Sequence, residues 1–394
     1  MIEHVQLSED QGKFLSAVRK GQNIFLTGKA GTGKTHVVKT AMAMLTEEGK
    51  QFIAVAPTGV AANNMGGVTA HSMFALTPHG MIGYDDCNWM RAEKRRIFDL
   101  VDVVFIDEVS MLRPDMLDGM NWTLIKNGCK PLTEMQIIFI GDLKQLPAPI
   151  DDNFKSMLLT RYDDCEFFNA LVYKQLDVRT IELNEVKRQS DPEFIDNLNL
   201  IRDGFKAPYF RQFMTKIPKG IILAPHNTTV FGYNQQGLAS VEGETYTYHA
   251  VVDGNLKPAD FNMETVINVK DGCKIMYLVN SKNNKLINGT LGIFRMMEDT
   301  PMIEVDGILW PIEKSKQTKK DYVLDLATNK LVLKEIGSIE QMPFKLAYAL
   351  TINKSQGLSF DVCTIDLTRD CFSKGMLYVA LSRVRTPLGL NIIK

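Results

Sequence analysis

The stretch NIFLTGKAGTGKTHVVKTAMAML, Asn23 to Leu45, decides the fold of this chain. Ile24 to Thr27 is a short apolar run suited to a buried parallel strand. Gly28 to Thr35 then reads G-x-x-x-x-G-K-T, and apolar side chains follow at helical spacing up to Leu45. A strand, a glycine-rich loop and a helix in this order are the context that a phosphate-binding loop requires.

Such a loop holds phosphates mainly through its backbone. Glycines let N–H groups curl around the phosphates, and the N-terminus of the next helix adds positive potential. Lys34 is expected to reach the β- and γ-phosphates, and the Thr35 hydroxyl to take one position around Mg²⁺. The alternative, a chance turn between a strand and a helix, is disfavoured by the correct flanks. The stretch therefore predicts binding of a nucleoside triphosphate.

Length and charge limit the class of protein. A chain of 394 residues is too long for one compact core, so two or three domains are expected. The formal net charge is −1, so any polyanion site must be a local groove.

Cysteine usage and the N-terminus bear on the compartment. The six cysteines contain no C-x-x-C pair, and the six histidines do not cluster with them, which favours reduced thiols in a cytoplasmic compartment over a zinc site. The first ten residues lack the layout of a signal or transit peptide, and no apolar run approaches membrane-spanning length.

An acidic pair follows a later strand. Val101 to Asp107 reads VDVVFID and leads into Glu108, which is the Walker B arrangement. We expect Asp107 to hold the Mg²⁺ shell and Glu108 to polarise the attacking water. Buried strands rarely end in two carboxylates without a ligand, because uncompensated charge there is costly. A further strand, Gln136 to Gly141, precedes Gln145, whose amide is placed to sense the γ-phosphate.

Two other segments carry polar groups near these strands. A first helix, Leu7 to Gly21, carries Gln11, whose amide suits an adenine edge, although the residue taken alone favours a surface position with no ligand. After the strand Phe52 to Ala56 comes PTGVAANNMGGVTAHSMF, with hydroxyl and imidazole donors suited to phosphates and sugars and with Phe74 suited to stacking a base. The alternative for this second segment is a structural loop with a buried aromatic.

Two regions of the remaining chain depart from the alternation of strands and helices. Leu76 to Trp89 is expected to form a small surface insertion. Residues 242–344 are expected to form short β-strands and turns. Within the latter, Gly289 to Met342 resembles a small inserted β-barrel. Strands expected outside this region are Thr180–Leu183, Gly220–Ala224, Asp361–Leu367 and Gly389–Ile393, with a helix at Leu377–Arg385.

Together these motifs resemble the superfamily 1B DNA helicases of the petite-integration-frequency type, within the wider RecD-like group. The resemblance runs from Leu7 to Arg385. It rests on GKAGTGKT, APTGVAA, GGVTAHSMF, IDEVSML, FIGDLKQLP, VKRQSDPEF, NGTLG, TINKSQGLSFD and LYVALSRV, and on EVSMLRPDMLDGMNWTL after the acidic pair.

The resemblance implies an α/β fold with two RecA-like P-loop domains. The first would span residues 1–178, with a wedge insertion at about 75–90. The second would span 179–288 and 343–394, with an SH3-like β-barrel inserted at 289–342.

It also implies roles for individual residues. The residues expected to act in catalysis are Lys34, Glu108, Gln145, Arg188 and Arg383. The two arginines would be arginine fingers that contact ATP. Nucleotide contacts fall on Gln11, Gly31, Thr32, Gly33, Lys34, Thr35, Gln356 and Gly357, and Mg²⁺ on Thr35 and Asp107. DNA contacts fall on Pro57, Thr58, Thr69, His71, Ser72, Phe74, Asn227, Thr351, Lys354 and Ser355.

Two positions depart from the family pattern. Asn353 stands where the family usually has His in T-x-H-K-S-Q-G, which puts that DNA contact in doubt. Ala148 replaces the second Pro of the usual Q-L-P-P, and we expect this change to loosen the coupling between nucleotide sensing and DNA binding.

The function that follows is an ATP-dependent 5′-to-3′ DNA helicase, using ATP and Mg²⁺ on single-stranded and forked duplex DNA. A cytoplasmic monomer, on a bacterial nucleoid or in a phage-infected cell, is expected. Two alternatives stay open: a P-loop switch acting on a protein partner, and an unwinder of RNA or RNA–DNA hybrids.

Overall fold

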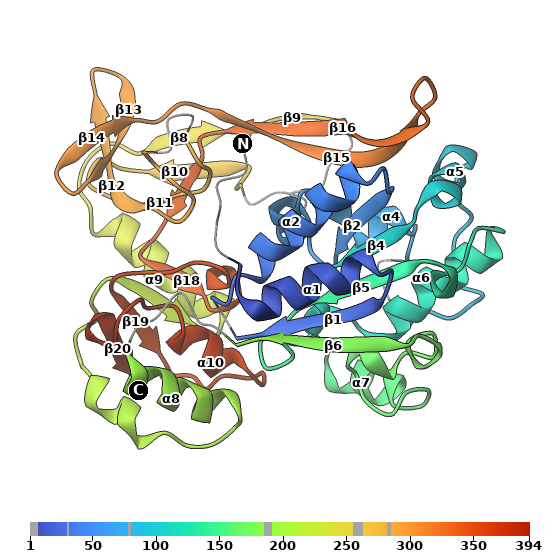
Figure 1. The fold of residues 1–394 in the computed structure, drawn as a ribbon. Helices are drawn as coiled ribbons and strands as arrows, with labels where there is room; N and C mark the ends of the chain where they lie inside the picture. The colour runs from blue at the N-terminus through green and yellow to red at the C-terminus, as the bar shows by residue number, and fades with distance from the viewer. Residues whose placement is uncertain (1–6, 30, 78–79, 185–190, 255–262, 282–284) are drawn as a thin grey trace. The chain divides into compact units, whose positions relative to one another are not determined.

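The computed structural model describes residues 7–29, 31–77, 80–184, 191–254, 263–281 and 285–394. The chain divides into two compact units, each made of two segments (Figure 1). The first unit is Met1–Arg188 with Lys320–Glu335, and the second is Gln189–Lys319 with Ile336–Lys394. None of the described helices is long and apolar enough to span a membrane.

The first unit is built on a six-stranded parallel sheet of order β3-β2-β4-β5-β1-β6. Its strands are β1 (Asn23–Gly28), β2 (Phe52–Ala56), β3 (Val68–Thr69), β4 (Val103–Ile106), β5 (Gln136–Ile140) and β6 (Val178–Leu183). Its helices are α1 (Glu9–Arg19), α2 (Lys34–Glu47), α3 (Gly59–Met65), α4 (Ala70–Met73), α5 (Ala92–Leu100), α6 (Pro114–Lys126) and α7 (Asp152–Leu158).

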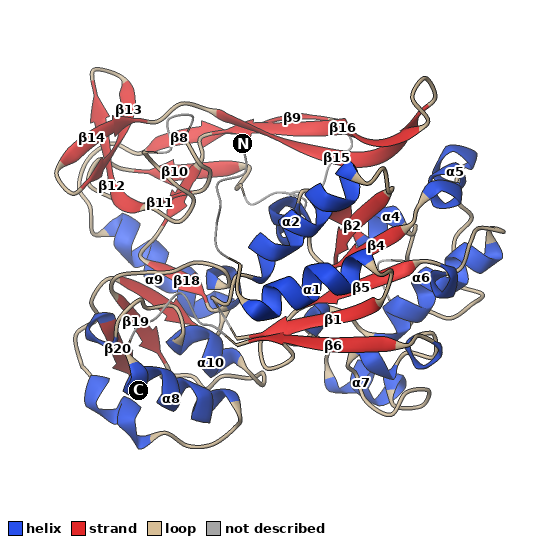
Figure 2. Cartoon of the chain, viewed as in Figure 1, coloured by secondary structure: helices blue, strands red, loops and turns tan. Residues whose placement is uncertain are grey.

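Both faces of this sheet are buried, because alternate strand residues point to opposite sides. On one face, strand residues pack against α1 and α2; they include Ile24, Leu26, Val103, Phe105, Ile138 and Ile140. On the other face, strand residues pack with α4, α5 and α6; they include Phe25, Val104, Ile106, Ile137 and Phe139. The predicted doubly wound first domain is therefore confirmed as a helix–sheet–helix arrangement (Figure 2).

The sixth strand differs from the sequence expectation. We placed Thr180–Leu183 at the start of the second domain, after a boundary at residue 178. In the structure, β6 pairs in parallel with β1 along its whole length, from Asn23 opposite Val178 to Gly28 opposite Leu183. The strand pattern is the same in either sheet, so local sequence could not assign it.

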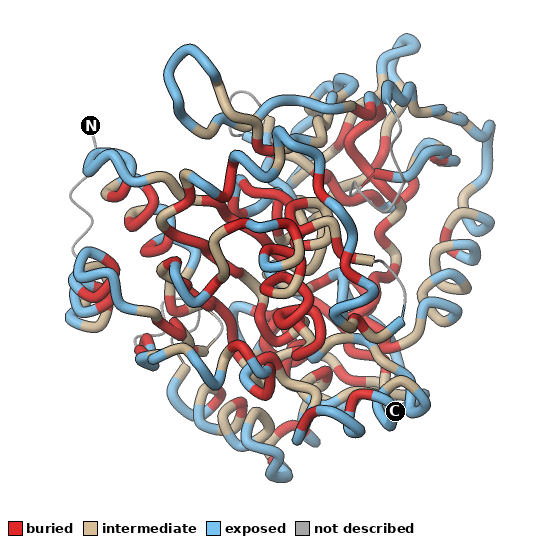
Figure 3. Tube along the Cα trace, turned by 90° about the vertical axis from the view of Figure 1, so that its right-hand side faces the viewer, coloured by how far each residue is buried: buried red, intermediate tan, exposed pale blue. Residues whose placement is uncertain are grey.

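The second unit contains a four-stranded parallel sheet of order β18-β7-β19-β20. Its strands are β7 (Ile221–Ala224), β18 (Ala349–Thr351), β19 (Cys363–Asp366) and β20 (Leu390–Ile393). The helices of this unit are α8 (Pro192–Arg202), α9 (Asn227–Ala239) and α10 (Met376–Leu381). Buried segments of the chain are surrounded by exposed ones (Figure 3).

The β-rich region also differs in extent from the predicted insertion at 289–342. Its five-stranded antiparallel sheet includes β11 and β17, which lie outside that range. Asp306 and Gly307 both have positive φ, so the turn joining β13 to β14 is a tight hairpin. The strands of this region are β8 (Tyr246–His249), β9 (Val251–Asp253), β10 (Val266–Val269), β11 (Lys274–Tyr277), β12 (Leu291–Met297), β13 (Thr300–Val305), β14 (Ile308–Pro311), β15 (Ser315–Asp325), β16 (Lys330–Gln341) and β17 (Phe344–Leu346).

Part of β15 and β16 packs within the first unit. The Tyr322 hydroxyl accepts a hydrogen bond of 3.1 Å from the Ala54 backbone N–H, and the Leu331 N–H donates to the Gln51 side chain at 3.1 Å. The Tyr322 ring belongs to the same apolar cluster as α5 and α6. These pairings join residues far apart in sequence, and the sequence analysis did not foresee them.

Candidate functional site

The phosphate-binding loop has the backbone that its glycines allow. Gly28, Gly31 and Gly33 have φ of +146°, +82° and +83°, a region in which other residues are strained. A β-carbon at Gly28 would also lie 2.6 Å from the Leu183 carbonyl oxygen. The loop then runs directly into α2, which starts at Lys34. Glycine is thus required here for both conformation and space.

Lys34 lies over this loop. Its Nζ donates to the carbonyl oxygens of Gly28 at 2.7 Å and Lys29 at 3.1 Å. The Thr32 hydroxyl, which is buried, donates to the Lys29 carbonyl at 2.9 Å. The ammonium group is therefore held at the loop, where a phosphate chain would replace carbonyl partners with stronger charged ones.

Gln11 lies beside the same loop rather than on the surface. Its side chain is 2% exposed, and its Oε1 accepts from the Ser8 N–H at 3.0 Å in the capping box of α1. A β-carbon at Gly33 would lie 3.2 Å from Gln11 Nε2. The cap fixes one end of the amide and leaves Nε2 toward the loop, as a purine contact requires.

The acidic pair follows β4 as predicted. The Asp107 Oδ1 accepts from the Glu108 N–H at 2.8 Å, and the Asp107 N–H donates to the Val55 carbonyl at 2.9 Å. Burial raises the pKa of the Asp107 carboxyl, and that backbone hydrogen bond and the positive charge of Lys34 oppose the rise. Lys34 and Asp107 therefore interact across the ends of β1 and β4.

Glu108 has a feature that sequence did not reveal: a φ of +50°, unusual for a residue other than glycine. The following backbone packs tightly on the end of β5, because a β-carbon at Gly141 would lie 2.9 Å from Val109 Cγ2. Strained backbone of this kind clusters at functional sites. The strained residue lies at the point where β4 leads into the turn Val109–Met111.

Gln145 lies at the same strand ends as Lys34 and the acidic pair. It follows β5 and its Nε2 lies 3.5 Å from Oδ2 of Asp142, a buried carboxylate whose Oδ1 accepts from the Lys144 N–H at 3.0 Å. Because β1, β5 and β4 are parallel neighbours in register, the structure brings Lys34, Asp107 and Gln145 to one edge of one sheet.

These residues fit a magnesium nucleotide. A carboxylate and a hydroxyl are hard oxygen ligands of the kind Mg²⁺ prefers, together with phosphate oxygens and water. Asp107 supplies a carboxylate at the end of β4, and Thr35 is exposed in the first turn of α2. Among the described residues, no group of three or more His, Cys, Asp or Glu side chains is placed to hold a metal.

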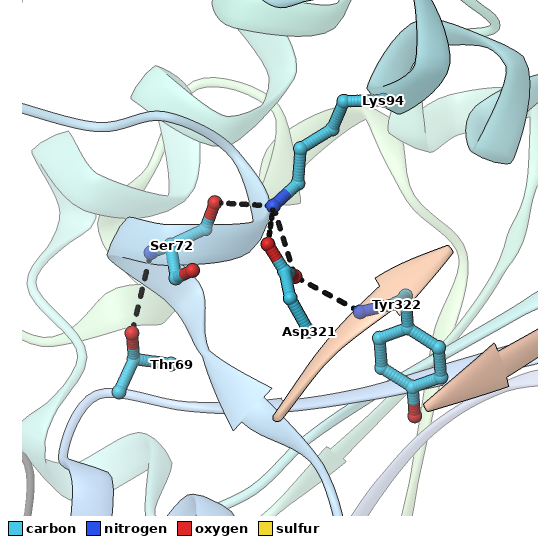
Figure 4. Close-up of polar contacts among 5 residues, drawn as sticks. All are labelled: Thr69, Ser72, Lys94, Asp321 and Tyr322. Carbon is cyan, nitrogen blue, oxygen red and sulfur yellow. Dashed lines mark hydrogen bonds and ion pairs between the residues drawn. The ribbon is translucent and has the colours of Figure 1, made fainter. Parts of the chain in front are cut away.

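The predicted DNA contacts of the first unit cluster after β2 and β3. Thr58 caps α3 and accepts from the Ala61 N–H at 3.3 Å. Thr69 caps α4 and accepts from the Ser72 N–H at 3.2 Å (Figure 4). Each cap uses a hydroxyl lone pair, which leaves the hydroxyl hydrogen as a donor. Pro57 is half-buried in the same segment.

His71 is a partly buried neutral donor. Burial lowers the pKa of its imidazole, and the positive charge of Arg113 lowers it further, against a smaller opposing effect of Asp115. At neutral pH, His71 therefore offers a hydrogen bond rather than a positive charge to a phosphate.

The prediction that Phe74 stacks a base is wrong for this structure. Its ring is 0% exposed and packs on Phe98 of α5, with ring centroids 5.2 Å apart. The alternative, a loop ending in a buried aromatic, is the one observed. An apolar residue after a polar segment reads the same whether it faces the core or a ligand, so sequence could not decide.

A polar link that local sequence patterns do not predict lies beside this segment. Lys94 Nζ binds the Ser72 carbonyl at 2.8 Å and the Asp321 carboxylate at 2.8 Å and 3.0 Å (Figure 4). Both charged side chains are largely buried, being 16% and 21% exposed. Beside them lies a cavity of about 500 Å³ that also contacts Trp89 and Tyr322. The link fixes α4, which carries His71 and Ser72, to β15.

In the second unit, the predicted DNA contacts gather at strand ends. Thr351 ends β18, and its hydroxyl accepts from the Lys354 N–H at 3.3 Å. Asn227 begins α9 directly after β7, the neighbour of β18, and is exposed, as is Lys354. Ser355 is fully buried, and its hydroxyl donates to the Ile352 carbonyl at 2.8 Å, so the structure gives it a turn-forming role.

Arg383 is buried in the second unit rather than displayed on a helix. α10 ends at Leu381, and the Arg383 side chain is 1% exposed. Its Nη1 donates to the carbonyl oxygens of Ser355 at 3.3 Å and Leu358 at 3.2 Å. These carbonyls bracket Gln356 and Gly357, two predicted nucleotide contacts.

Arg383 thus positions the loop that contains Gln356 and Gly357, and its role as an arginine finger stays a prediction. Arg188, the other predicted finger, lies outside the described residues. Of the two departures from the family pattern, Asn353 is exposed at the start of the turn Asn353–Ser355, and Ala148 is half-buried.

Replacing Arg383 with Gln should lower the free energy of unfolding by about 2–4 kcal/mol, because the buried guanidinium loses its hydrogen bonds to the carbonyls of Val379, Ser355 and Leu358. Arg385→Gln is the matched control: Arg385 is exposed and pairs at 2.9 Å with the exposed Asp361, an interaction worth about 0–1 kcal/mol. Urea denaturation measures both. Equal stability of Arg383→Gln and the parent would contradict the positioning role.

A buried lysine next to the predicted DNA contacts gives a pH-dependent prediction. Lys345 on β17 is 7% exposed, and burial, aided by the positive charge of Lys354, lowers its pKa to about 8 from its ordinary value of 10.5. Between these values the unfolded chain binds the extra proton, so stability of the parent rises with pH.

Lys345→Met should therefore be more stable than the parent at pH 7, by up to about 3 kcal/mol, and this advantage should shrink between about pH 8 and pH 10.5. Lys330→Met, at an exposed position of β16, is the control. Denaturation at several pH values measures the difference, and an advantage that stays constant across this window would refute the assignment.

Comparison with known proteins supports a single family. The model described as PIF1-like helicase matches residues 6–220, more than half of the chain. The ATP-dependent DNA helicase Pif1 of Bdellovibrio bacteriovorus is 30% identical, over 100% of this chain and 89% of that protein.

Two solved structures from Bacteroides are similar across nearly the whole chain. Bacteroides sp Pif1 in complex with ADP-AlF4 has a TM-score of 0.88 and 33% identity, covering 98% of this chain and 92% of that one. Bacteroides Pif1 bound to ssDNA has a TM-score of 0.69 and 34% identity, with the same coverage. The α/β fold with a RecA-like parallel sheet is thereby confirmed, and this chain belongs to the PIF1-like helicase family.

Proposed function

We propose that this chain is an ATP-dependent DNA helicase that moves 5′-to-3′ on single-stranded DNA and unwinds forked duplexes. The observation that carries the proposal is the meeting of Lys34, Asp107 and Gln145 at one edge of the first sheet. Its relatives are named ATP-dependent DNA helicases, and a similar structure holds ADP-AlF4.

ATP would lie on the loop Gly28–Thr35, with its adenine beside Gln11. Lys34 would neutralise the β- and γ-phosphates, while Glu108 would orient and polarise the attacking water. Thr35 and Asp107 would hold Mg²⁺, which supplies charge neutralisation on the phosphates. Gln145 would report the γ-phosphate to the loop that follows β5. The predicted contacts of Arg188, Arg383, Gln356 and Gly357 with the nucleotide belong to this proposal.

Single-stranded DNA would cross the strand ends of both parallel sheets. On the first unit the contacts are Pro57, Thr58, Thr69, His71 and Ser72; on the second they are Asn227, Thr351 and Lys354. Hydroxyl, amide and ammonium donors of this kind bind phosphates and sugars and so favour no sequence. A similar structure is bound to ssDNA, in keeping with this role.

Directional movement would arise if ATP binding and hydrolysis change the grip of each unit on the strand in turn. The wedge role of residues 75–90, the SH3-like character of the inserted strands, action as a monomer and a cytoplasmic location are part of the same proposal.

Lys34→Ala should abolish ATP hydrolysis, and Glu108→Gln should retain ATP binding while losing about 10²–10⁴-fold in turnover, because the general base is removed. Lys39→Ala, an exposed position of α2, is the control. Phosphate release and binding of a fluorescent ATP analogue separate the two effects. Normal phosphate release by Glu108→Gln would remove that residue from the base role.

Unwinding of tailed duplexes tests the direction. In the presence of ATP and Mg²⁺, a duplex with a 5′ single-stranded tail should be separated and one with a 3′ tail should not. A motor that travels 5′-to-3′ moves toward the duplex from a 5′ tail and away from it on a 3′ tail. A strand-displacement assay with labelled DNA measures both. Preference for the 3′ tail, or ATP turnover without separation of either substrate, would refute the proposal.

A further inference from the structure

Two aromatic side chains of the second unit stand together at its strand ends. Phe372, in the segment between β19 and α10, is 63% exposed. Its ring centroid lies 5.1 Å from that of His226, and the ring planes are tilted by 42°. Neither residue is among the predicted DNA contacts, so the sequence analysis missed the pair.

The pair is held by local contacts. His226 lies between β7 and α9 as the N-cap residue of α9, and its Nε2 lies 3.3 Å from the Asp370 carbonyl oxygen. A carbonyl can only accept, so Nε2 donates, and the imidazole ring is fixed in orientation. One face of the Phe372 ring is therefore backed by a positioned ring.

His226 and Phe372 lie near the carboxyl ends of the parallel strands β7 and β19. β7 and β19 are parallel neighbours, with Leu223 opposite Ile365, so the chain leaves both at the same edge. β18 ends at that edge too, with Thr351 opposite Ala224. Ligands of open α/β sheets gather outside the carboxyl ends of the strands. His226 and Phe372 thus share an edge with Asn227 and Thr351.

The charges around the pair favour an anionic partner. Arg369 is exposed, and its Nη1 donates to the Thr228 hydroxyl of α9 at 3.0 Å, which fixes a cation at this edge. The other exposed charges of the segment are Asp370 and Lys374, so the balance is positive. A flat aromatic face next to a fixed guanidinium suits a nucleobase followed by its phosphate.

We propose that His226 and Phe372, with Arg369, form a stacking platform for one base of a single strand that crosses the carboxyl edge of β7 and β19. This inference rests on the proposed function, because it assumes that DNA follows this edge. It gives the second unit a contact with a base in addition to its contacts with phosphate and sugar. Stacking tolerates any base, so the platform adds affinity without sequence preference.

Fluorescence anisotropy with a labelled oligothymidylate tests the platform. Phe372→Ala should raise the Kd roughly 5- to 150-fold, the equivalent of about 1–3 kcal/mol for one stacked base. Phe372→Trp should restore binding, because it retains an aromatic face. Phe205→Ala removes a phenylalanine of the same unit that is 64% exposed and should leave the Kd unchanged.

An oligonucleotide with the same backbone and abasic positions separates stacking from phosphate contact. The parent should bind it more weakly, and Phe372→Ala should lose nothing further. An unchanged Kd of Phe372→Ala on oligothymidylate, or an equal loss on both oligonucleotides, would overturn the platform.

Asn227→Ala separates this failure from failure of the proposed function. If Asn227→Ala weakens binding while Phe372→Ala does not, DNA follows this edge and the platform alone is wrong. If neither variant weakens binding, the platform falls together with the proposed DNA path over the second unit.

Discussion

The parallel register of β1, β5 and β4 is the constraint on which the nucleotide site depends. Because Leu26 pairs with Ile140, and Ile106 with Phe139, three loops from distant parts of the sequence leave the sheet at one edge. The positive charge of Lys34 then acts on the buried carboxyl of Asp107. A shift of one residue in any of these strands would turn its apolar side chains to the opposite face and separate the charges.

Much of this arrangement could be predicted from sequence, because strand, loop and helix each leave a local pattern. The glycines of the phosphate loop and the acidic pair after β4 lie where their patterns indicate. Phe74 could not be assigned, since burial depends on Phe98, which belongs to another element. The pairing of β6 with β1 and the ion pair of Lys94 with Asp321 likewise depend on contacts between distant segments.

The role of Arg383 in the structure differs from the role that its residue type suggests. The family resemblance implies a charge presented to ATP, yet the guanidinium is buried against the carbonyls of Ser355 and Leu358. The loop between these carbonyls carries Gln356 and Gly357, so the arginine fixes a segment expected to face the nucleotide. A buried arginine is stable there because several oxygens satisfy its donors.

If the strand ends that hold the nucleotide and those that hold DNA belong to one motor, DNA must change the rate of ATP hydrolysis. The measurement is the steady-state rate of ATP hydrolysis with and without a single-stranded oligonucleotide. Hydrolysis should be slow in the absence of DNA, and its rate should rise and saturate as the oligonucleotide is added. An unchanged rate, in protein that binds ATP normally, would refute the motor and favour a switch that acts on a protein partner.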